Sequence, residues 1–295
     1  MGGIGFSSKC RFGRPLAATE LVPGVIHVTH HLHQLKPGGT VALDEIPTRG
    51  EEYCADRDQA ENDFKRLRKE LCDWQSRLYA SEDQKLLVVL QALDAGGKDG
   101  TIRRVFQGVN PQGVRVTSFK SPTRRELKHD YLWRIHQAVP AAGMIGVFNR
   151  SHYEDVLAVR VHEIVPEAVW RPRYEQINHF ESLLNETGTK IVKIFLHISK
   201  QEQKKRFEER LQIPEKNWKF SHEDLEKRKY WDDYQNAFQE MLERCTTDAA
   251  PWHVIPADQK WYRNMAVAHL LVTTLREMDP QYPSAPAGLD DVVVD

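Results

Sequence analysis

Cysteine is scarce in this sequence of 295 residues, and it never occurs in closely spaced pairs. The spacing that zinc knuckles and disulfide frameworks require is therefore missing from Cys10, Cys54, Cys72 and Cys245. No apolar run approaches the roughly 20 residues that a membrane-spanning helix needs, and residues 1–15 lack the apolar stretch of a secretory signal. These absences predict a cytoplasmic protein that does not interact with a membrane.

A strong overall charge is also missing. The chain carries 41 Lys and Arg against 42 Asp and Glu, a formal net charge of −1. Because no global field recruits a polyanion, any basic surface must be local. Residues 103–134 supply eight basic side chains against two acids, and residues 200–229 supply ten against seven. Taken alone, each segment is typical of a solvated helix face.

Short apolar runs alternate with helical stretches along most of the chain. Since parallel strands need long crossover connections, this alternation predicts an α/β fold, a parallel sheet with helices on both faces. Ligands in such sheets bind beyond the carboxyl ends of the strands. The predicted strands are residues 86–90, 114–119, 144–148, 190–198 and 253–256.

Two terminal segments flank the body of the chain, which we place at residues 51–278. Residues 1–50 are rich in Gly, Pro and His and predict an extended arm. The histidines of the stretch 27–33 lack the carboxylate or thiolate partners of a metal site, so a packed or mobile arm is the preferred interpretation. Residues 279–295 are rich in Pro and Asp and predict a disordered tail.

One long helix is predicted from residue 60 onward. Apolar residues recur there in steps of four and three at Phe64, Leu67, Leu71, Trp74 and Leu78, which places them on one helical stripe. We expect this stripe to pack against the body of the domain. A helix–helix dimer seam is the alternative, although the repeat covers few heptads.

The first predicted strand runs into the segment LDAGGKDGT, which resembles the phosphate-binding Walker A pattern GxxxxGK[ST]. Lys98 follows a glycine as the pattern requires, whereas Ala92 and Asp99 replace its first glycine and its magnesium-binding Ser or Thr. Glycines there let backbone amides approach an anion, and the lysine supplies a positive charge. An ordinary strand-to-helix turn is the alternative. The loop residues predicted to bind phosphate are Gly96, Gly97, Asp99, Gly100 and Thr101.

Carboxylates around this loop predict a bound cation. Asp94 would be repelled by a phosphate unless it held a cation or received a proton. The third strand leads into Asn149, where a Walker B strand has a magnesium-binding Asp, so we assign Mg²⁺ to Asp94 with Glu154 or Asp155. Arg150 should enter the same crevice as the loop lysine and bind an acceptor phosphate. A structural pair between Arg150 and Glu154 is the alternative.

Two further segments combine charge with a recognisable role. Between the loop and the third strand, Phe119, Tyr131 and Trp133 could stack on a base, although the last two could equally be core residues. The nearby Lys120, Arg124 and Arg134 would then reach phosphate. Residues 200–230 predict two helices interrupted at Ile213-Pro214, the shape of a lid that closes over phosphates and excludes water.

Taken together, these segments resemble the polyphosphate kinase 2 family, phosphotransferases that use inorganic polyphosphate as phosphoryl donor for nucleotides. Asp99 and Asn149 most resemble its third subgroup, which phosphorylates both nucleoside mono- and diphosphates. The resemblance runs from about residue 35 to residue 275. The matching motifs are LDAGGKDGT, GVNPQG, SFKSPT, HDYLWR, FNRSHYEDVL, FLHISKQEQKKRFEERL, PEKNWKFS and PADQKWY.

The resemblance implies a P-loop kinase fold like that of thymidylate kinase, with a five-stranded parallel sheet and a helical lid. It also implies that Asp94 is the essential loop carboxylate, Lys98 the P-loop lysine and Arg150 the acceptor-phosphate arginine. The lid residues expected to line a polyphosphate channel are Arg206, Arg210, Lys216 and Lys219. We assign nucleotide contacts to Phe119, Lys120, Arg134 and Tyr153.

The leading hypothesis is therefore transfer of a phosphoryl group from polyphosphate to AMP, ADP and their guanine counterparts, with Mg²⁺ as cofactor. Catalysis would rest on positioning and charge neutralisation. The alternatives are an ATP-dependent nucleotide kinase of thymidylate-kinase type and a non-catalytic P-loop protein. No nucleic-acid partner is expected, since the basic segments lack the spaced stacking aromatics of a single-strand binder. The heptad-like helix and the family resemblance favour a homodimer or homotetramer.

Overall fold

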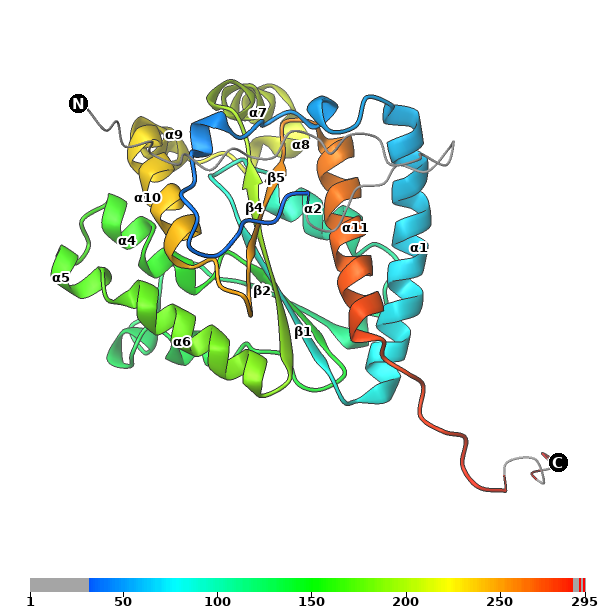
Figure 1. The fold of residues 1–295 in the computed structure, drawn as a ribbon. Coiled ribbons are helices and arrows are strands. Elements are labelled where there is room, and N and C mark those ends of the chain that lie inside the picture. The colour runs from blue at the N-terminus through cyan, green and yellow to red at the C-terminus, as the bar shows by residue number, and fades with distance from the viewer. Residues whose placement is uncertain (1–31, 289–291, 293, 295) are drawn as a thin grey trace, which may run out of the picture.

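The computed structural model describes residues 32–288, 292 and 294, and it is built around one five-stranded sheet (Figure 1). Every neighbouring pair of strands is parallel, in the order β2-β3-β1-β4-β5. The strands are β1 (Lys85–Gln91), β2 (Val114–Ser118), β3 (Ile145–Asn149), β4 (Thr189–His197) and β5 (Trp252–Pro256). The α/β prediction is confirmed, and each predicted strand agrees with the observed one to within a residue at either end.

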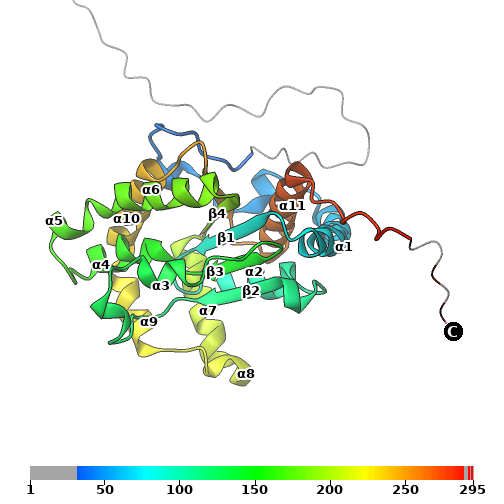
Figure 2. The same cartoon turned by 90° about the horizontal axis from the view of Figure 1, so that it is seen from below.

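Helices cover both sides of this sheet, as Figures 1 and 2 show. On one side lie α1 (Arg57–Ser81), α2 (Lys98–Val105) and α11 (Lys260–Met278). On the other side lie α6 (Arg173–Glu186) and α10 (Trp231–Arg244), with the short helices α3 (Trp133–His136), α4 (Ala158–Val161) and α5 (Glu167–Trp170). Strands β1, β4 and β5 are almost entirely buried, which explains why they read as continuous apolar runs.

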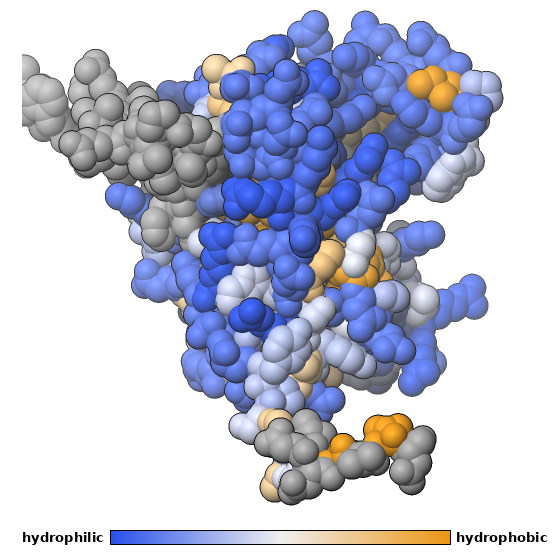
Figure 3. Space-filling model, turned by 90° about the vertical axis from the view of Figure 1, so that its right-hand side faces the viewer, coloured by the Kyte–Doolittle hydropathy of each residue, from blue (hydrophilic) through white to orange (hydrophobic). Residues whose placement is uncertain are grey.

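The long helix α1 begins at an N-cap, where the Asp56 side chain accepts a hydrogen bond from the Gln59 amide. Along its predicted stripe Leu67, Leu71 and Leu78 are buried, and α1 packs lengthwise on α11. The face of the molecule on which α1 lies is mostly hydrophilic (Figure 3). Most of the apolar stripe is therefore packed within the chain, as expected, and the alternative of a dimer seam is not tested. The oligomeric state stays a prediction.

The described part of the N-terminal arm packs on β5. The Leu35 amide donates to the Trp252 carbonyl, and Leu43 is buried in a 3₁₀ turn. His33 is buried and its Nε2 lies 2.7 Å from the Tyr262 hydroxyl. Burial and the neighbouring His253 lower the pKa of His33 to about 3, so this ring is neutral. The other histidines of the 27–33 stretch lie outside the described residues.

The lid segment contains three helices, whereas two were predicted. They are α7 (Lys200–Gln212), α8 (Pro214–Asn217) and α9 (His222–Lys229). The interruption at Ile213-Pro214 lies where proline predicted it. The second interruption was missed; it precedes Ser221, whose side chain caps α9 by accepting from the Glu223 amide.

Neither the domain limits nor the disorder of the tail is tested, and both stay predictions. Residues 279–288 contain no helix or strand. Within the described ranges, every helix is either too short or too polar to cross a bilayer.

Candidate active site

The phosphate-binding loop joins β1 to α2 at the carboxyl end of the sheet. Gly97 forms the N-cap of α2 with φ at 105°, and a Cβ there would overlap the guanidinium of Arg263. A Cβ at Gly96 would lie 2.5 Å from that of Ala92. Only glycine fits at both positions. The buried Thr101 hydroxyl donates to the Gly97 carbonyl at 3.1 Å and closes the first turn of the helix.

Lys98 is folded back into the loop. Its side chain is buried, and its ammonium donates to the carbonyls of Ala92 at 2.7 Å and Leu93 at 3.3 Å. Burial, reinforced by repulsion from Arg150, lowers the pKa of Lys98 to about 8 although nearby carboxylates oppose the shift. The charge that the loop offers to an anion is therefore sensitive to pH.

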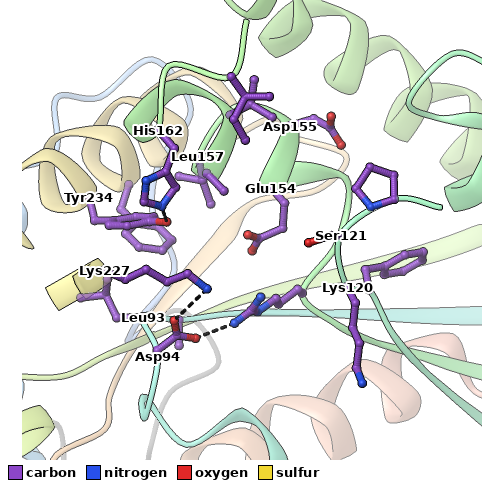
Figure 4. A pocket seen from close by; sticks show the side chains of 18 of the residues that line it. Leu93, Asp94, Lys120, Ser121, Glu154, Asp155, Leu157, His162, Lys227 and Tyr234 are labelled. Atoms are coloured by element: carbon purple, nitrogen blue, oxygen red, sulfur yellow. Dashed lines mark hydrogen bonds and ion pairs between the residues drawn. The ribbon is translucent and has the colours of Figure 1, made fainter. Parts of the chain in front are cut away.

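The Asp94 carboxylate lies beside two positively charged side chains. Its Oδ1 lies 2.5 Å from Arg150 Nη2, and its Oδ2 lies 4.0 Å from the ammonium of Lys227 (Figure 4). Burial raises the pKa of this carboxyl, but Arg150, Lys98 and Lys227 together outweigh burial and lower it. Asp94 is thus held ionised, and the hydrogen-bonded partner of Arg150 is Asp94 instead of the Glu154 considered from the sequence.

Arg150 has an unusual backbone conformation. Its φ is 61°, in the left-handed region that favours glycine, and its amide donates to the Leu90 carbonyl at 3.1 Å. The turn after β3 places the guanidinium beside Asp94. Burial opposes the charged form of Arg150, but Glu154 and Asp94 raise its pKa above the usual value. The arginine is a fixed positive charge at the end of the strand.

A cavity of about 320 Å³ lies on this side of the loop, and we call it the mixed cavity because its wall combines charged with apolar side chains. Asp94, Arg150 and Glu154 line its charged part, and Figure 4 shows Glu154 projecting into it. Trp231 and Phe238 are among the apolar side chains that complete the wall.

Three of the residues predicted to contact a nucleotide line the mixed cavity: Phe119, Lys120 and Arg134. Arg134 Nη1 donates to the Lys120 carbonyl at 2.8 Å, and its guanidinium lies 5.5 Å from the ring centre of Phe119. The alternative that Tyr131 and Trp133 are core residues holds in part for Tyr131, which is half-buried against the core, and not for Trp133. Neither lines this cavity; Tyr131 packs under Arg173, and Trp133 stacks on a histidine.

Tyr153, the fourth predicted nucleotide contact, is a correction. Its side chain is fully buried, and its hydroxyl donates to Glu181 at 2.7 Å and accepts from the Lys193 ammonium at 2.9 Å. The 3₁₀ turn His152–Asp155 directs Tyr153 into the interior while Glu154 and Asp155 reach the cavity wall.

A second cavity, of about 1410 Å³, lies on the other side of the loop, and we call it the basic cavity. Ala95, Gly97 and Gly100 form its loop wall. Twelve Lys and Arg side chains against six Asp and Glu surround it. They include Arg57, Lys65 and Arg68 from α1, Arg103 and Arg104 from α2, and Lys204 and Lys205 from α7. The near-neutral chain therefore concentrates positive charge at this one place.

Two of the four predicted lid residues line the basic cavity. Arg206 is buried there and donates to the carbonyls of Ala95 at 2.9 Å and Ala257 at 2.5 Å. Lys216 lines the cavity and pairs with a carboxylate of α7 at 3.0 Å. Arg210 and Lys219 do not line it, and their role stays a prediction. Arg210 pairs with α9, and Lys219 lies over Trp218 at 4.9 Å from its ring centre.

The predicted metal ligands Asp94, Glu154 and Asp155 all line the mixed cavity, and their role stays a prediction. Across residues 32–288, 292 and 294, no group of three His, Cys, Asp or Glu side chains is arranged to hold a metal ion. Asp155 lines the mixed cavity, but its Oδ1 accepts from Arg173 at 3.1 Å. Asp94 and Glu154 do face the same space (Figure 4). Since Mg²⁺ often needs only one or two carboxylates when substrate phosphates supply other ligands, these donors fit a cation shared with substrate.

Several residues in the site escaped sequence reasoning. Gln203 donates to the Asp94 carbonyl at 2.9 Å, and the lid residue Lys227 lies beside the Asp94 carboxylate. Arg263 follows the PADQKWY motif directly and packs on Gly97. Burial and the nearby Arg206 lower the pKa of Arg263 to about 9. The sequence signals were the position of Gln203 inside the motif FLHISKQEQKKRFEERL, of Lys227 in a basic segment and of Arg263 directly after a motif.

Comparison with known proteins shows the family to which this chain belongs. A family model described as Polyphosphate kinase 2 (PPK2) matches residues 54–283. The chain belongs to the polyphosphate kinase 2 family. The predicted family and enzyme class, a phosphotransferase driven by polyphosphate, are thereby confirmed. Kinases of this family generally need a divalent metal. The alternatives of an ATP-dependent thymidylate-type kinase and of a non-catalytic P-loop protein are not supported.

Relatives and solved structures agree with this assignment. An AMP/ADP-polyphosphate phosphotransferase of Meiothermus ruber is 55% identical over 229 residues, which cover 78% of this chain and 86% of the relative. An ADP-polyphosphate phosphotransferase of Rhodopseudomonas palustris is 43% identical over 258 residues, 83% of this chain and 89% of the relative. The crystal structure of polyphosphate kinase 2 from Arthrobacter aurescens TC1 superposes with a TM-score of 0.84 at 42% identity, covering 88% of this chain and 93% of that one.

Proposed function

We propose that this chain transfers the terminal phosphoryl group of inorganic polyphosphate to AMP and ADP, and to GMP and GDP, to give the di- and triphosphates. One observation carries the proposal: two cavities of different chemistry adjoin a single phosphate-binding loop, with Asp94 on one wall and Gly97 on the other. The names of the Meiothermus and Rhodopseudomonas relatives support AMP and ADP as acceptors.

The mixed cavity is the proposed acceptor site. A nucleotide has an apolar, stackable base at one end and phosphates at the other, and the wall offers both kinds of surface. Arg150 would bind the acceptor phosphate through its planar guanidinium. Phe119 and Arg134 line the same cavity and would contact the nucleoside.

The basic cavity is the proposed donor site. Its many Lys and Arg side chains come from several helices, as suits a polymer with a charge on every unit. Arg206 and Lys216 of the lid contribute to this wall. Carboxylates also line this cavity, such as Glu209, which pairs with Lys216, and the donor phosphates would compete with them for the lysine and arginine side chains.

In the transfer, an anionic oxygen of the acceptor phosphate forms a bond to the terminal phosphorus of the donor while the P–O bond to the next phosphate breaks. Because the attacking oxygen is already anionic, no strong base is required. Lys98 would neutralise charge between the two sites, and Asp94 would orient Arg150. A divalent cation, which we propose to be Mg²⁺, would neutralise phosphate charge when bound, with Asp94 and Glu154 available as carboxylate ligands. A cytoplasmic location and a dimeric or tetrameric assembly complete the proposal.

One assay tests the proposed function. Purified protein, Mg²⁺ and long-chain polyphosphate are incubated with AMP, ADP, GMP or GDP separately, and the products are resolved by chromatography. We expect ADP and then ATP from AMP. Product formation only after ATP is added as donor would overturn the proposal.

A further inference from the structure

The turn that carries Arg150 into the mixed cavity also has side chains that point away from it. Arg150, Glu154 and Asp155 line the cavity, whereas His152 and Tyr153 between them are fully buried and do not line it. Because both sets lie within one short stretch of backbone, the side chains that face the cavity are only as well placed as the buried ones.

The start of this turn is held by the phosphate-binding loop and the neighbouring strand. The Asn149 Nδ2 donates to Asp99 Oδ1 at 2.6 Å. The side-chain amide of Gln91, the last residue of β1, lies 3.1 Å from the Ser151 hydroxyl. These contacts fix the point at which the turn leaves β3.

A single carboxylate holds the buried middle of the turn. Glu181 lies on α6 and is 1% exposed. Its Oε1 accepts from the Tyr153 hydroxyl at 2.7 Å and lies 3.1 Å from His152 Nε2. Two consecutive side chains are therefore tied to one oxygen atom of a separate helix, and the position of Glu181 sets the direction of both rings.

Glu181 is itself held by Lys193, which lies on β4 and is fully buried. The Lys193 ammonium donates to Glu181 Oε2 at 2.6 Å, to the Tyr153 hydroxyl at 2.9 Å and to the Cys245 carbonyl, so all three of its protons are used. Burial raises the pKa of Glu181, but Lys193 and His152 outweigh burial and lower it. The carboxylate is therefore ionised and paired.

These charges are not needed to hold α6 on the sheet. Taking a charged pair out of water costs free energy, so apolar residues of similar volume often stabilise a core as well or better. A fully bonded polar network, however, also fixes the direction of its members. Direction matters in this turn, because Arg150 has a φ of 61°, a conformation that persists only where the surroundings enforce it.

We propose that Glu181 and Lys193 are positioning residues for the acceptor site. Through the two buried side chains of the turn, they hold Arg150 and Glu154 facing the mixed cavity. Neither Glu181 nor Lys193 lines the mixed or the basic cavity, so they act on the reaction through the turn alone. Because the mixed cavity is the acceptor site only under the proposed function, this role rests on that function. The pair governs the use of the nucleotide and leaves the use of the donor unchanged.

The decisive variant is E181M/K193M, in which methionine replaces both charged side chains at similar volume. We expect its melting temperature to stay close to that of the wild type, since such exchanges are often neutral. Its affinity for ADP, measured by calorimetry without donor, and its kcat/KM for ADP should fall about 10–100-fold, as displacements of about 1 Å in a site can cause. The KM for polyphosphate should not change. A network that only stabilises the fold predicts normal ADP use once stability is kept, so wild-type ADP affinity in the folded variant would overturn the proposal.

Tyr153→Phe gives a second measurement that does not depend on the folding of the double variant, because it removes only one hydroxyl. We expect its affinity for ADP to fall about 2–10-fold, the effect of one hydrogen bond. Tyr262→Phe is the matched control: Tyr262 is equally buried, its hydroxyl lies 2.7 Å from His33 Nε2, and it lines neither cavity. Equal losses in the two variants, or no loss in Y153F, would overturn the proposal. If ADP binding changes as expected but the wild type phosphorylates no nucleotide from polyphosphate, the proposed function fails and the positioning role stands.

Discussion

The two cavities on either side of the P-loop differ in how they can recognise a ligand. The mixed cavity is about 320 Å³ and offers aromatic, aliphatic and charged side chains of both signs. The basic cavity is about 1410 Å³, and Lys and Arg outnumber Asp and Glu around it by twelve to six. The first can select a molecule by shape and by a few placed charges, whereas the second can only select by charge. A kinase that transfers a phosphoryl group from a polymer of varying length to a defined acceptor needs both kinds of site.

The supporting contacts follow the same division. In the mixed cavity Asp94, Arg150 and Lys227 hold one another in place. In the basic cavity many cations lie on exposed helix faces, for example Arg57 and Lys65 on α1. Substitutions in the mixed cavity should therefore affect the use of the nucleotide, and substitutions in the basic cavity the use of the donor. Substitutions in the loop should affect both.

Lys98→Ala removes the buried positive charge of the loop that adjoins both sites, and we expect the largest loss. Turnover should fall by at least about 10²–10³-fold, since the variant lacks a charge placed where phosphate charge develops. The measurement is initial-rate kinetics with polyphosphate and ADP, and circular dichroism shows whether the variant folds. Near-normal turnover in a folded variant would contradict the role of Lys98.

Arg150→Ala should damage the acceptor side alone. We expect kcat/KM for AMP and ADP to fall by about 10²-fold, because the acceptor phosphate loses its guanidinium and Asp94 loses its partner. The KM for polyphosphate should change less than about twofold. Arg244→Ala is the control, as Arg244 pairs with Glu240 and lines neither cavity. An equal rise in both KM values would mean that the two sites are not separate.

The pH dependence of donor use should report Lys98. Its pKa of about 8 means that the ammonium is present below pH 8 and is lost as the pH rises above it. With nucleotide and polyphosphate both well below their KM values, the rate should fall by about tenfold per pH unit above this value, because the rate then reports the free enzyme. Lys98→Arg should lack this decline, since arginine keeps its charge. The same decline in both proteins would point to another group.

Charge removal on α1 should produce the smallest of these effects, most visible with long donors. In the triple variant R57Q/K65Q/R68Q the KM for long-chain polyphosphate should rise by roughly tenfold, since each charge near the surface contributes up to about 1 kcal/mol. The difference should shrink at high salt.

Tripolyphosphate, which is a much shorter donor, should show less change. The matched control is R66Q/K69Q/R77Q, which removes three cations of the same helix that do not line the cavity. Equal effects of the two triple variants would show that the helix charge acts only through the overall field.

Much of this architecture was predictable, because periodicity and loop chemistry are local properties of a sequence. The strands were found from apolar runs, and Lys98 and Gly97 from the Walker spacing. Arg150 was placed correctly because it directly follows a strand whose end faces the ligand side of the sheet. The pairing of Arg150 with Asp94 was not predictable, since it depends on a left-handed backbone at Arg150.

The differences from the sequence predictions have a common physical origin in side-chain direction. Tyr153 precedes Glu154, yet one points into the core and the other into the cavity because they lie in a 3₁₀ turn. Arg206 and Arg210 are one helical turn apart, but Arg210 forms an ion pair with Asp224 of α9. No pattern in the sequence shows which partner a long cationic side chain will find.

The side chains that hold the P-loop in place also determine at which stage of folding the site can form. Gln203 and Arg206 donate to the carbonyls of Asp94 and Ala95 across 109 and 111 residues of chain, and Arg263 packs on the loop from still further along. Contacts of such sequence separation require the closure of long loops and form slowly. A growing chain that has completed β1 and α2 therefore has the loop sequence without its supports. Catalytic competence becomes one of the last properties that this protein acquires as it folds.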